Sequence, residues 1–190
     1  MSAMDADVQS EVRMMGGFIP AIMRKFLAGE SLMAGVYSSP REGARIFLAP
    51  GIPGEVREYD LSGRSLMMTA GSYLACEEGV TLGTKFGGLQ AIFSGEGMFF
   101  IEATGNGRLW FNSYGAIIEK DIDGTFVVDT GHLVAWEPGL TWNIGKVGNW
   151  FSTFFSGEGL VMKFEGRGKI WLQTRSLDSI ASWLSGYCIG

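Results

Sequence analysis

Three basic residues occupy the same place in three similar stretches of the sequence, and they are the first candidates for a binding site. Arg45, Arg108 and Lys169 each follow a Gly-containing turn and each open a short apolar run. A ring of basic side chains about a common axis could bind an anion. Such residues are more often the solvated face of a strand, so anion binding stands as the alternative to a purely structural role.

Two acidic series accompany the basic one, each with one residue in each stretch. The members are Asp5, Glu77 and Glu137 in one series, and Glu30, Glu96 and Glu158 in the other. Acid–base catalysis needs a pair of groups that face one cleft, which threefold repetition does not favour. A carboxylate beside Gly-rich backbone can accept N–H hydrogen bonds. We therefore expect a structural role for both series.

The residues that commonly bind metals are scarce in this chain. His132 is the only histidine, whereas a cupin-like metal site needs two or three histidines converging inside a β-barrel. The two cysteines, Cys76 and Cys188, are far apart in sequence and predict reduced thiols packed as small hydrophobes. We expect a protein that is not an enzyme and has no cofactor, and a cupin-like metal-dependent enzyme is the least favoured class.

Aromatic residues supply the candidate contacts with other proteins. The chain contains 6 Trp and 13 Phe, and Trp110 and Trp171 occupy matching positions that predict core packing. The other tryptophans lack a full set of matching partners and are better interface candidates: Trp136, Trp142, Trp150 and Trp183. We expect self-association, with Trp150, Phe151 and Trp183 as anchors.

A recurring motif places these residues on a repeated β unit. Phe93-Ser94-Gly95-Glu96-Gly97 returns unchanged at residues 155–159, and an altered copy lies at residues 26–31. After each copy an apolar run, a Gly-containing turn and a second apolar run predict a β-hairpin. Two of these turns are Gly105-Asn106-Gly107 and Gly166-Arg167-Gly168, in which we expect positive φ at or next to Gly107 and Gly168.

The repeated units predict an all-β fold, a duplicated β-helix or β-sandwich-like body. We expect a single compact domain over residues 1–190, built from pseudo-repeats at 1–55 (incomplete), 56–116 and 117–176. Such units should pack about a pseudo-axis and bury more apolar surface together than alone.

Two stretches have the spacing of a helix. Residues 177–185 place apolar side chains on one face after a suitable N-cap, Ser176, and predict a short C-terminal capping helix. Residues 17–27 also have helix-like spacing, with Pro20 near the start.

Composition limits the functional classes. The net charge of −5 argues against non-specific nucleic-acid binding, which needs a basic surface. No stretch approaches the ~18 apolar residues that span a bilayer, and no secretory signal opens the chain. These features predict a cytoplasmic protein without a transmembrane segment. Only 18% of the residues are charged, which favours contacts through apolar surface.

The combined motifs resemble a widespread family, the mitochondrial biogenesis proteins named for altered inheritance of mitochondria. The Gly-Glu-Gly motifs, the Gly-x-Gly-(Arg/Lys) turns and the runs at residues 131–136 and 171–176 carry the resemblance, which covers about residues 3–176. It implies a fold similar to the tryptophan RNA-binding attenuation protein and no assigned activity or catalytic residue. Family members usually have an opening strand pair before residue 3, so the first pseudo-repeat is expected to be incomplete.

The leading hypothesis is therefore a non-enzymatic scaffold or protein-interaction domain that acts as a homo-oligomer. The alternative is a small-molecule or anion-binding protein that uses Arg45, Arg108 and Lys169. The identity of a partner or ligand, the oligomer size and whether Met1 is the natural start of the chain are left open.

Overall fold

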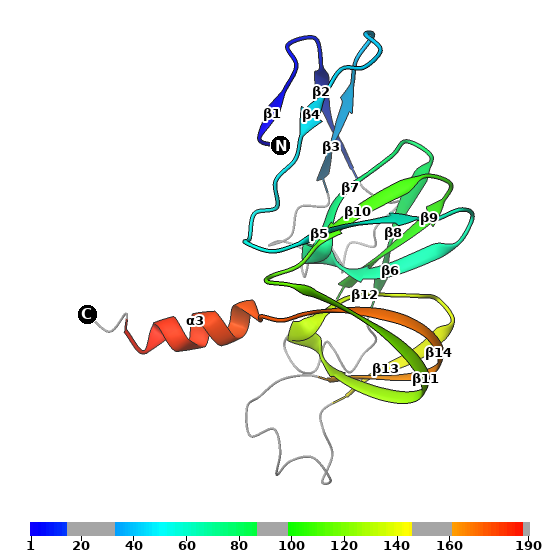
Figure 1. Ribbon diagram of the computed structural model, residues 1–190, viewed down its shortest axis with the longest axis vertical. Coiled ribbons are helices and arrows are strands. Elements are labelled where there is room, and N and C mark those ends of the chain that lie inside the picture. Colours follow the sequence, from blue (N-terminus) through cyan, green and yellow to red (C-terminus); the bar gives the residue numbers. More distant parts are fainter. Residues whose placement is uncertain (15–32, 87–98, 146–160, 188–190) are drawn as a thin grey trace.

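The computed structural model describes residues 1–14, 33–86, 99–145 and 161–187 (Figure 1). These residues form mostly β-strands, with one α-helix near the C-terminal end, and the sheets do not close into a barrel. The predicted all-β class with a short C-terminal helix is confirmed. The predicted helix at residues 17–27 lies outside the described residues.

The strands fall into three successive groups along the long axis of the molecule (Figure 1). We call residues 1–55, 56–116 and 117–176 the first, second and third unit. The first unit contains β1 (Ala3–Met4), β2 (Gln9–Met14), β3 (Met33–Ser38) and β4 (Ile46–Phe47). The second contains β5 (Val56–Asp60), β6 (Ser65–Thr69), β7 (Tyr73–Cys76), β8 (Val80–Phe86), β9 (Phe99–Gly105) and β10 (Arg108–Asn112). The third contains β11 (Ile117–Asp129), β12 (Leu133–Trp136), β13 (Leu140–Gly145) and β14 (Val161–Gln173).

The same two antiparallel pairings occur in every unit. In the second unit β8 pairs with β9 and β7 pairs with β10. In the third unit β13 pairs with the first half of β14, and β12 pairs with its second half. In the first unit the corresponding pairs are β2 with β3 and β1 with β4. Whether the units superpose about a common axis stays a prediction.

Linking strands pair with the second edge of β9, β10 and β14 in the second and third units. β5 pairs with β10 and β6 pairs with β9, while β11 pairs with β14 along its whole length. β6 also pairs with β12, which joins the second unit to the third. Within the described part of the chain, β3 pairs only with β2 and β4 only with β1, so the first unit has no linking strand.

The prediction that the Gly-x-Gly turns close hairpins is wrong. β9 and β10 belong to different sheets and do not pair with each other, and β14 runs without interruption through Gly166-Arg167-Gly168. Gly105 and Gly107, with φ of +112° and +140°, lie where the chain passes from one sheet to another, whereas Gly166, with φ of +118°, lies within the continuous strand β14. The positive φ predicted near Gly168 therefore falls two residues earlier.

Close backbone approach explains why glycine occupies the bends. A Cβ on Gly105 would lie 2.3 Å from the Gly79 carbonyl oxygen, and a Cβ on Gly79 would lie 2.1 Å from the Asn106 carbonyl oxygen. Both distances are far below van der Waals contact, so a side chain at either position would push the two strands apart. Short-range sequence predicts such a Gly-x-Gly as a hairpin because the competing strand partners are distant in sequence.

The core lies in the second and third units. One cluster surrounds Trp136, whose ring makes an edge contact with Phe100 at 4.9 Å between centroids. The other includes Leu109, Phe111 and Trp171. The prediction that Trp136 belongs to an interface is wrong, because it is fully buried, whereas Trp171 is buried as predicted. The first unit contributes no buried hydrophobic side chain among its described residues.

Helix α3 (Leu177–Ser185) follows the last strand and projects from the stacked strands (Figure 1). Ser176 is its N-cap, and the Ser176 hydroxyl accepts a hydrogen bond from the Ser179 N–H, as the sequence predicts. No side chain of α3 is buried, so the helix does not cap the core as expected.

Candidate functional site

One of the two acidic series, Asp5, Glu77 and Glu137, lies beside the basic series in every unit. We call this recurring arrangement the acid–base clamp. The carboxylate of the acidic residue accepts a hydrogen bond from the backbone N–H of the basic residue, at 3.1 Å for Asp5 with Arg45, 2.8 Å for Glu77 with Arg108 and 3.0 Å for Glu137 with Lys169. The backbone N–H of the acidic residue in turn donates to the carbonyl of the basic residue, at 2.9–3.0 Å in all three units. Each clamp therefore joins the equivalent pair of strands in its unit: β1 with β4, β7 with β10, or β12 with β14.

In the second unit the clamp also includes a full ion pair. Arg108 Nε donates to Glu77 Oε1 at 2.8 Å, and Arg108 Nη2 lies 2.6 Å from the same oxygen. Hydrogen bonds from the Arg108 backbone N–H and side chain hold the pKa of Glu77 below its ordinary value. The Arg108 guanidinium also lies over the Trp110 ring, 5.4 Å from its centroid. The Arg108 side chain therefore makes its ion pair and its ring contact within its own unit.

In the third unit the side chains of the clamp, Glu137 and Lys169, have other partners instead of each other. The Lys169 ammonium pairs with Glu119 of β11, which lowers the pKa of Glu119, and the Tyr59 hydroxyl of β5 donates to Glu137 Oε1 at 3.3 Å. Burial and the nearby Glu137 carboxylate raise the pKa of Tyr59. Lys169, like Arg108, is neutralised by a carboxylate of this chain.

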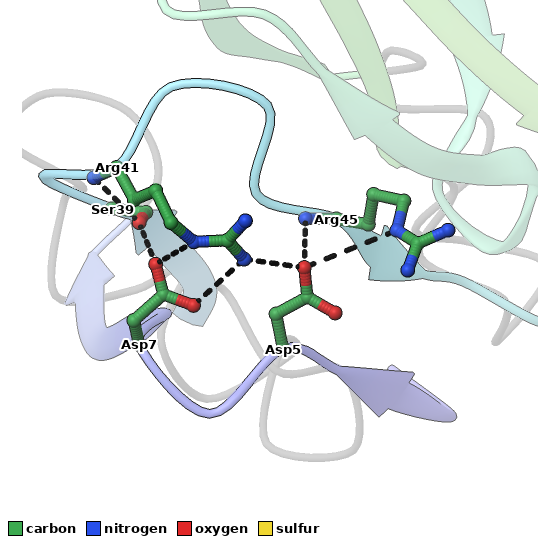
Figure 2. Close-up of polar contacts among 5 residues, drawn as sticks. All are labelled: Asp5, Asp7, Ser39, Arg41 and Arg45. Atoms are coloured by element: carbon green, nitrogen blue, oxygen red, sulfur yellow. Dashed lines mark hydrogen bonds and ion pairs between the residues drawn. The ribbon is translucent and has the colours of Figure 1, made fainter.

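In the first unit the clamp grows into the cluster of five residues in Figure 2. Arg41 Nε donates to Asp7 Oδ2 at 2.8 Å, and its Nη2 donates to both Asp7 and Asp5 at 3.0 and 2.7 Å. The Ser39 hydroxyl also donates to Asp7 at 2.9 Å. Hydrogen bonds from Arg41 and Ser39 hold the pKa of Asp7 well below its ordinary value. The cluster holds the turn after β3 against the turn between β1 and β2.

The Arg45 side chain is the least engaged member of the basic series. Its Nε lies 3.9 Å from Asp5 Oδ2, beyond hydrogen-bond distance, and the side chain is 73% exposed. The two other basic residues lie on β10 and β14, which belong to successive groups along the molecule (Figure 1). Anion binding by the three residues together stays a prediction, and the ion pairs of Arg108 and Lys169 weigh against it.

His132 and its surroundings have a structural arrangement. His132 Nδ1 donates to the Gln173 backbone carbonyl at 2.8 Å, and Gln173 Nε2 donates to the Gly131 carbonyl at 2.8 Å. Over the described ranges, no three His, Cys, Asp or Glu side chains are grouped so that they could hold a metal ion. Cys76 is a free, half-buried thiol within 3.4 Å of the Tyr73 hydroxyl.

Some predicted site residues cannot be placed. They lie outside the residues that the structure describes: Glu30, Glu96, Trp150, Phe151, Glu158 and Cys188. Of the three predicted interface anchors, only Trp183 is described. It lies on α3 and is 62% exposed.

The apolar residues of α3 share one face of the helix. Leu177, Ile180, Trp183 and Leu184 are all exposed, as is Tyr187 just beyond the helix, whose ring packs on Trp183 at 5.0 Å between centroids. The opposite face carries Ser and a single charged residue, Asp178. An amphipathic helix with an uncovered apolar face is a candidate contact surface. No helix in the described part of the chain has the length and hydropathy needed to cross a membrane.

Sequence reasoning missed Arg41 and the two aspartates that lie across the sheet from the basic residues of the clamps. Asp60 lies directly opposite Arg108 across β5 and β10, and Asp121 lies directly opposite Lys169 across β11 and β14. A signal was available, because each aspartate lies three residues before a glycine in equivalent stretches, Asp60 before Gly63 and Asp121 before Gly124. Nothing in the local sequence of Arg41 distinguishes it from an ordinary turn residue.

The chain is similar to known proteins in both sequence and fold. The family model described as Mitochondrial biogenesis AIM24 matches residues 1–175. An uncharacterised protein of Streptococcus pyogenes serotype M6 is 30% identical over 176 residues, which are 91% of this chain and 71% of the relative. A crystal structure of another Streptococcus pyogenes protein has a TM-score of 0.74 and 26% identity, and the match covers 98% of this chain and 85% of the other. The similarity to the tryptophan RNA-binding attenuation protein stays a prediction.

Proposed function

This chain belongs to the Mitochondrial biogenesis AIM24 family, and on that premise we propose that it is a non-enzymatic protein-interaction scaffold that acts as a homo-oligomer. The exposed apolar face of α3 carries the proposal. Its largest side chain, Trp183, is 62% exposed although the core buries Trp136 and Trp171 almost completely. Trp is enriched among the residues that dominate binding energy at protein interfaces.

Helix energetics support this role. Isolated helices of fewer than about 12–15 residues are marginal in water, and their stability comes mainly from packing an apolar face. Helix α3 spans 9 residues and buries none of them, so its N-cap and its length alone give it little stability. A partner surface that covers Leu177, Ile180 and Leu184 would supply the missing packing.

The charge of the helix favours a protein surface over an anionic membrane surface. Amphipathic helices that bind anionic lipids carry Lys and Arg on the polar face. Helix α3 has no basic residue, and its one charged residue, Asp178, lies in the first turn. The same helix in a second copy offers a matching apolar face, and closed symmetry is the usual outcome of self-association.

The test is analytical ultracentrifugation of the chain at micromolar concentration, with Trp183→Ser as the variant. We expect an oligomer that dissociates at least about tenfold more readily in the variant, because a buried Trp contributes the most to such contacts. Ser182→Ala, on the polar face of the same helix, is the matched control and should leave the oligomer unchanged. A monomer in the parent chain would refute the proposal, and an oligomer unaffected by Trp183→Ser would refute the role of α3.

A further inference from the structure

The apolar residues of α3 are spaced like those of helices that pack against a second helix. Four of them recur at intervals of three, four and three residues, which are the a and d positions of a heptad: Leu177, Ile180, Leu184 and Tyr187. The Tyr187 N–H donates to the Leu184 carbonyl at 2.9 Å, and Gly186 keeps a right-handed helical conformation, so the spacing continues to Tyr187. All four side chains are exposed, and we call them the α3 seam.

The α3 seam carries no charge, so it can face a copy of itself. Asp178 is the only charged residue within residues 177–187, and it lies on the opposite face of the helix. Two copies of the chain, each with a net charge of −5, therefore meet at this surface without placing like charges opposite each other. A two-fold interface uses the same patch on both copies and needs a patch that is complementary to itself.

The strands at the start of α3 determine how two such helices can be oriented. β14 ends at Gln173, just before the helix, and the far end of α3 points away from the strands (Figure 1). Packed helices lie 8–10 Å apart, which is no more than the spacing of two stacked sheets. A parallel pair would therefore force two strand bodies into the same space, whereas an antiparallel pair places them at opposite ends of the helices.

An antiparallel pair gives each residue of the seam a defined neighbour. Reversal of direction exchanges the two ends of the seam about its midpoint, which lies at residue 182. Leu177 of one copy then lies beside Tyr187 of the other, and Ile180 lies beside Leu184. Each layer combines a large or branched apolar side chain with a leucine or isoleucine, so the seam is filled along its length.

Two further residues flank the seam close to its midpoint. Trp183 occupies the heptad position on one side, and Ala181 occupies the position on the other side. In an antiparallel pair the two Trp183 rings meet on one side of the axis and the two Ala181 methyl groups meet on the other. The small alanines let the helices approach closely, while the tryptophans supply most of the contact area.

The size of the seam predicts a weak contact. Trp183 is 62% exposed and Tyr187 is 73% exposed, and a buried aromatic side chain covers roughly 150–250 Å². Together with the aliphatic residues of the seam, they expose on the order of 500 Å² in each copy. Stable complexes bury about 800 Å² per partner, so we expect reversible association at micromolar concentration.

We propose that two copies of the chain associate through an antiparallel pair of α3 helices, related by a two-fold axis beside residue 182. The inference rests on the self-association proposed above and specifies its geometry. The pair covers the apolar face that leaves a 9-residue helix marginal by itself, so helix formation and association stabilise each other.

Cysteine cross-linking in the full chain distinguishes the two orientations, with Cys76 and Cys188 replaced by Ser so that only introduced thiols react. Ala181→Cys should form a disulfide-linked dimer at least about tenfold faster than Ser182→Cys on the polar face, because paired thiols have a high effective concentration. Leu177→Cys should not cross-link to itself, because an antiparallel pair places its two copies about 15 Å apart along the helix, beyond the reach of a disulfide.

A mixture of two variants supplies a second, positive test. Chains with Leu177→Cys and chains with Tyr187→Cys should form a mixed disulfide, because the antiparallel pair places these residues side by side. Neither variant should cross-link when it is oxidised alone. The mixed product also shows that Leu177→Cys still associates, so its failure to cross-link to itself reports geometry.

Sedimentation of the cysteine-free background separates this inference from the proposed function. A monomer at every concentration would overturn both. An oligomer in which Leu177→Cys cross-links to itself and Ala181→Cys does not would mean a parallel pair. An oligomer in which no variant cross-links, or in which Ser182→Cys reacts as fast as Ala181→Cys, would mean contact through another surface. These last outcomes overturn the antiparallel pair and leave self-association in place.

Discussion

The first and second units share their pairings and their clamp but differ in what is buried. Both pair strands antiparallel in the same arrangement, and both set a carboxylate against the backbone N–H of a basic residue. The second unit has the additional strands β5 and β6 and contributes Phe100, Phe111 and other side chains to the core. The first unit has no such strands in its described residues and buries no hydrophobic side chain.

This difference shows that the clamp hydrogen bonds set the local geometry of a unit, whereas the linking strands provide the burial that stabilises it. In the first unit the clamp forms although no described hydrophobic side chain is buried there. Its backbone hydrogen bonds join two strands that lie side by side, and they need no packed core. A two-stranded pair is marginal by itself, and burial needs further strands that widen the pair into a sheet with an apolar face. The linking strands therefore convert a set of correct pairings into a packed unit.

The sharpest test of this comparison replaces one phenylalanine in each unit, although Phe47 occupies the place of Trp110 and not that of Phe111. Phe111→Ala should lower the free energy of unfolding by about 3–5 kcal/mol, because it leaves a cavity in the core. Phe47→Ala, on the corresponding strand of the first unit, should change it by about 0.5 kcal/mol or less, since its side chain is 53% exposed. Denaturant unfolding of the two variants measures the difference, and similar losses would show that the first unit is packed in solution.

Amide hydrogen exchange compares the strands themselves. We expect the amides of β3 to exchange more than about 100-fold faster than those of β9, because a strand with one neighbour and no buried side chain opens locally. Mass spectrometry of peptides that cover Met33–Ser38 and Phe99–Gly105 gives the two rates. Equal protection would mean that the free edge of β3 is covered.

A glycine substitution tests the close approach of strands in the second unit. Gly79→Ala should cost about 2 kcal/mol, because the new Cβ would lie 2.1 Å from the Asn106 carbonyl oxygen. Gly51→Ala in the first unit is the control, since nothing lies within 4 Å of its Cβ position. Thermal melting of the two variants measures the difference: we expect a lower melting temperature for Gly79→Ala than for Gly51→Ala.

The smallest expected effect is the loss of the Asp5 and Asp7 interactions with Arg41 at acidic pH. Asp5 and Asp7 have lowered pKa values because they accept hydrogen bonds from Arg41, so their contribution to the first unit is complete above the ordinary aspartate pKa of about 4. It should be lost as the pH falls through the lowered values. NMR resonances of residues 39–45 should shift in this acidic window, and Arg41→Met should remove the shift. An unchanged transition in the variant would exclude Arg41 as its cause.

Local chemistry made much of this fold predictable. The strand-rich composition, the Ser176 cap of α3 and the positions of the acidic and basic series all follow from residues close together in sequence. The pairing of Asp5, Glu77 and Glu137 with the basic series was not predicted, although each series was recognised. The partners lie 30 to 40 residues apart, where spacing alone does not specify contact.

The sequence by itself determined that the chain forms β-strands in similar units, with glycines where the backbone bends and one short helix at residues 177–185. Only the tertiary structure decided that Gly105-Asn106-Gly107 joins two sheets, that Trp136 lies in the core and that α3 leaves its apolar face exposed. The physical reason is that backbone conformation depends on nearby residues, whereas strand pairing and burial depend on which distant edges and faces are available.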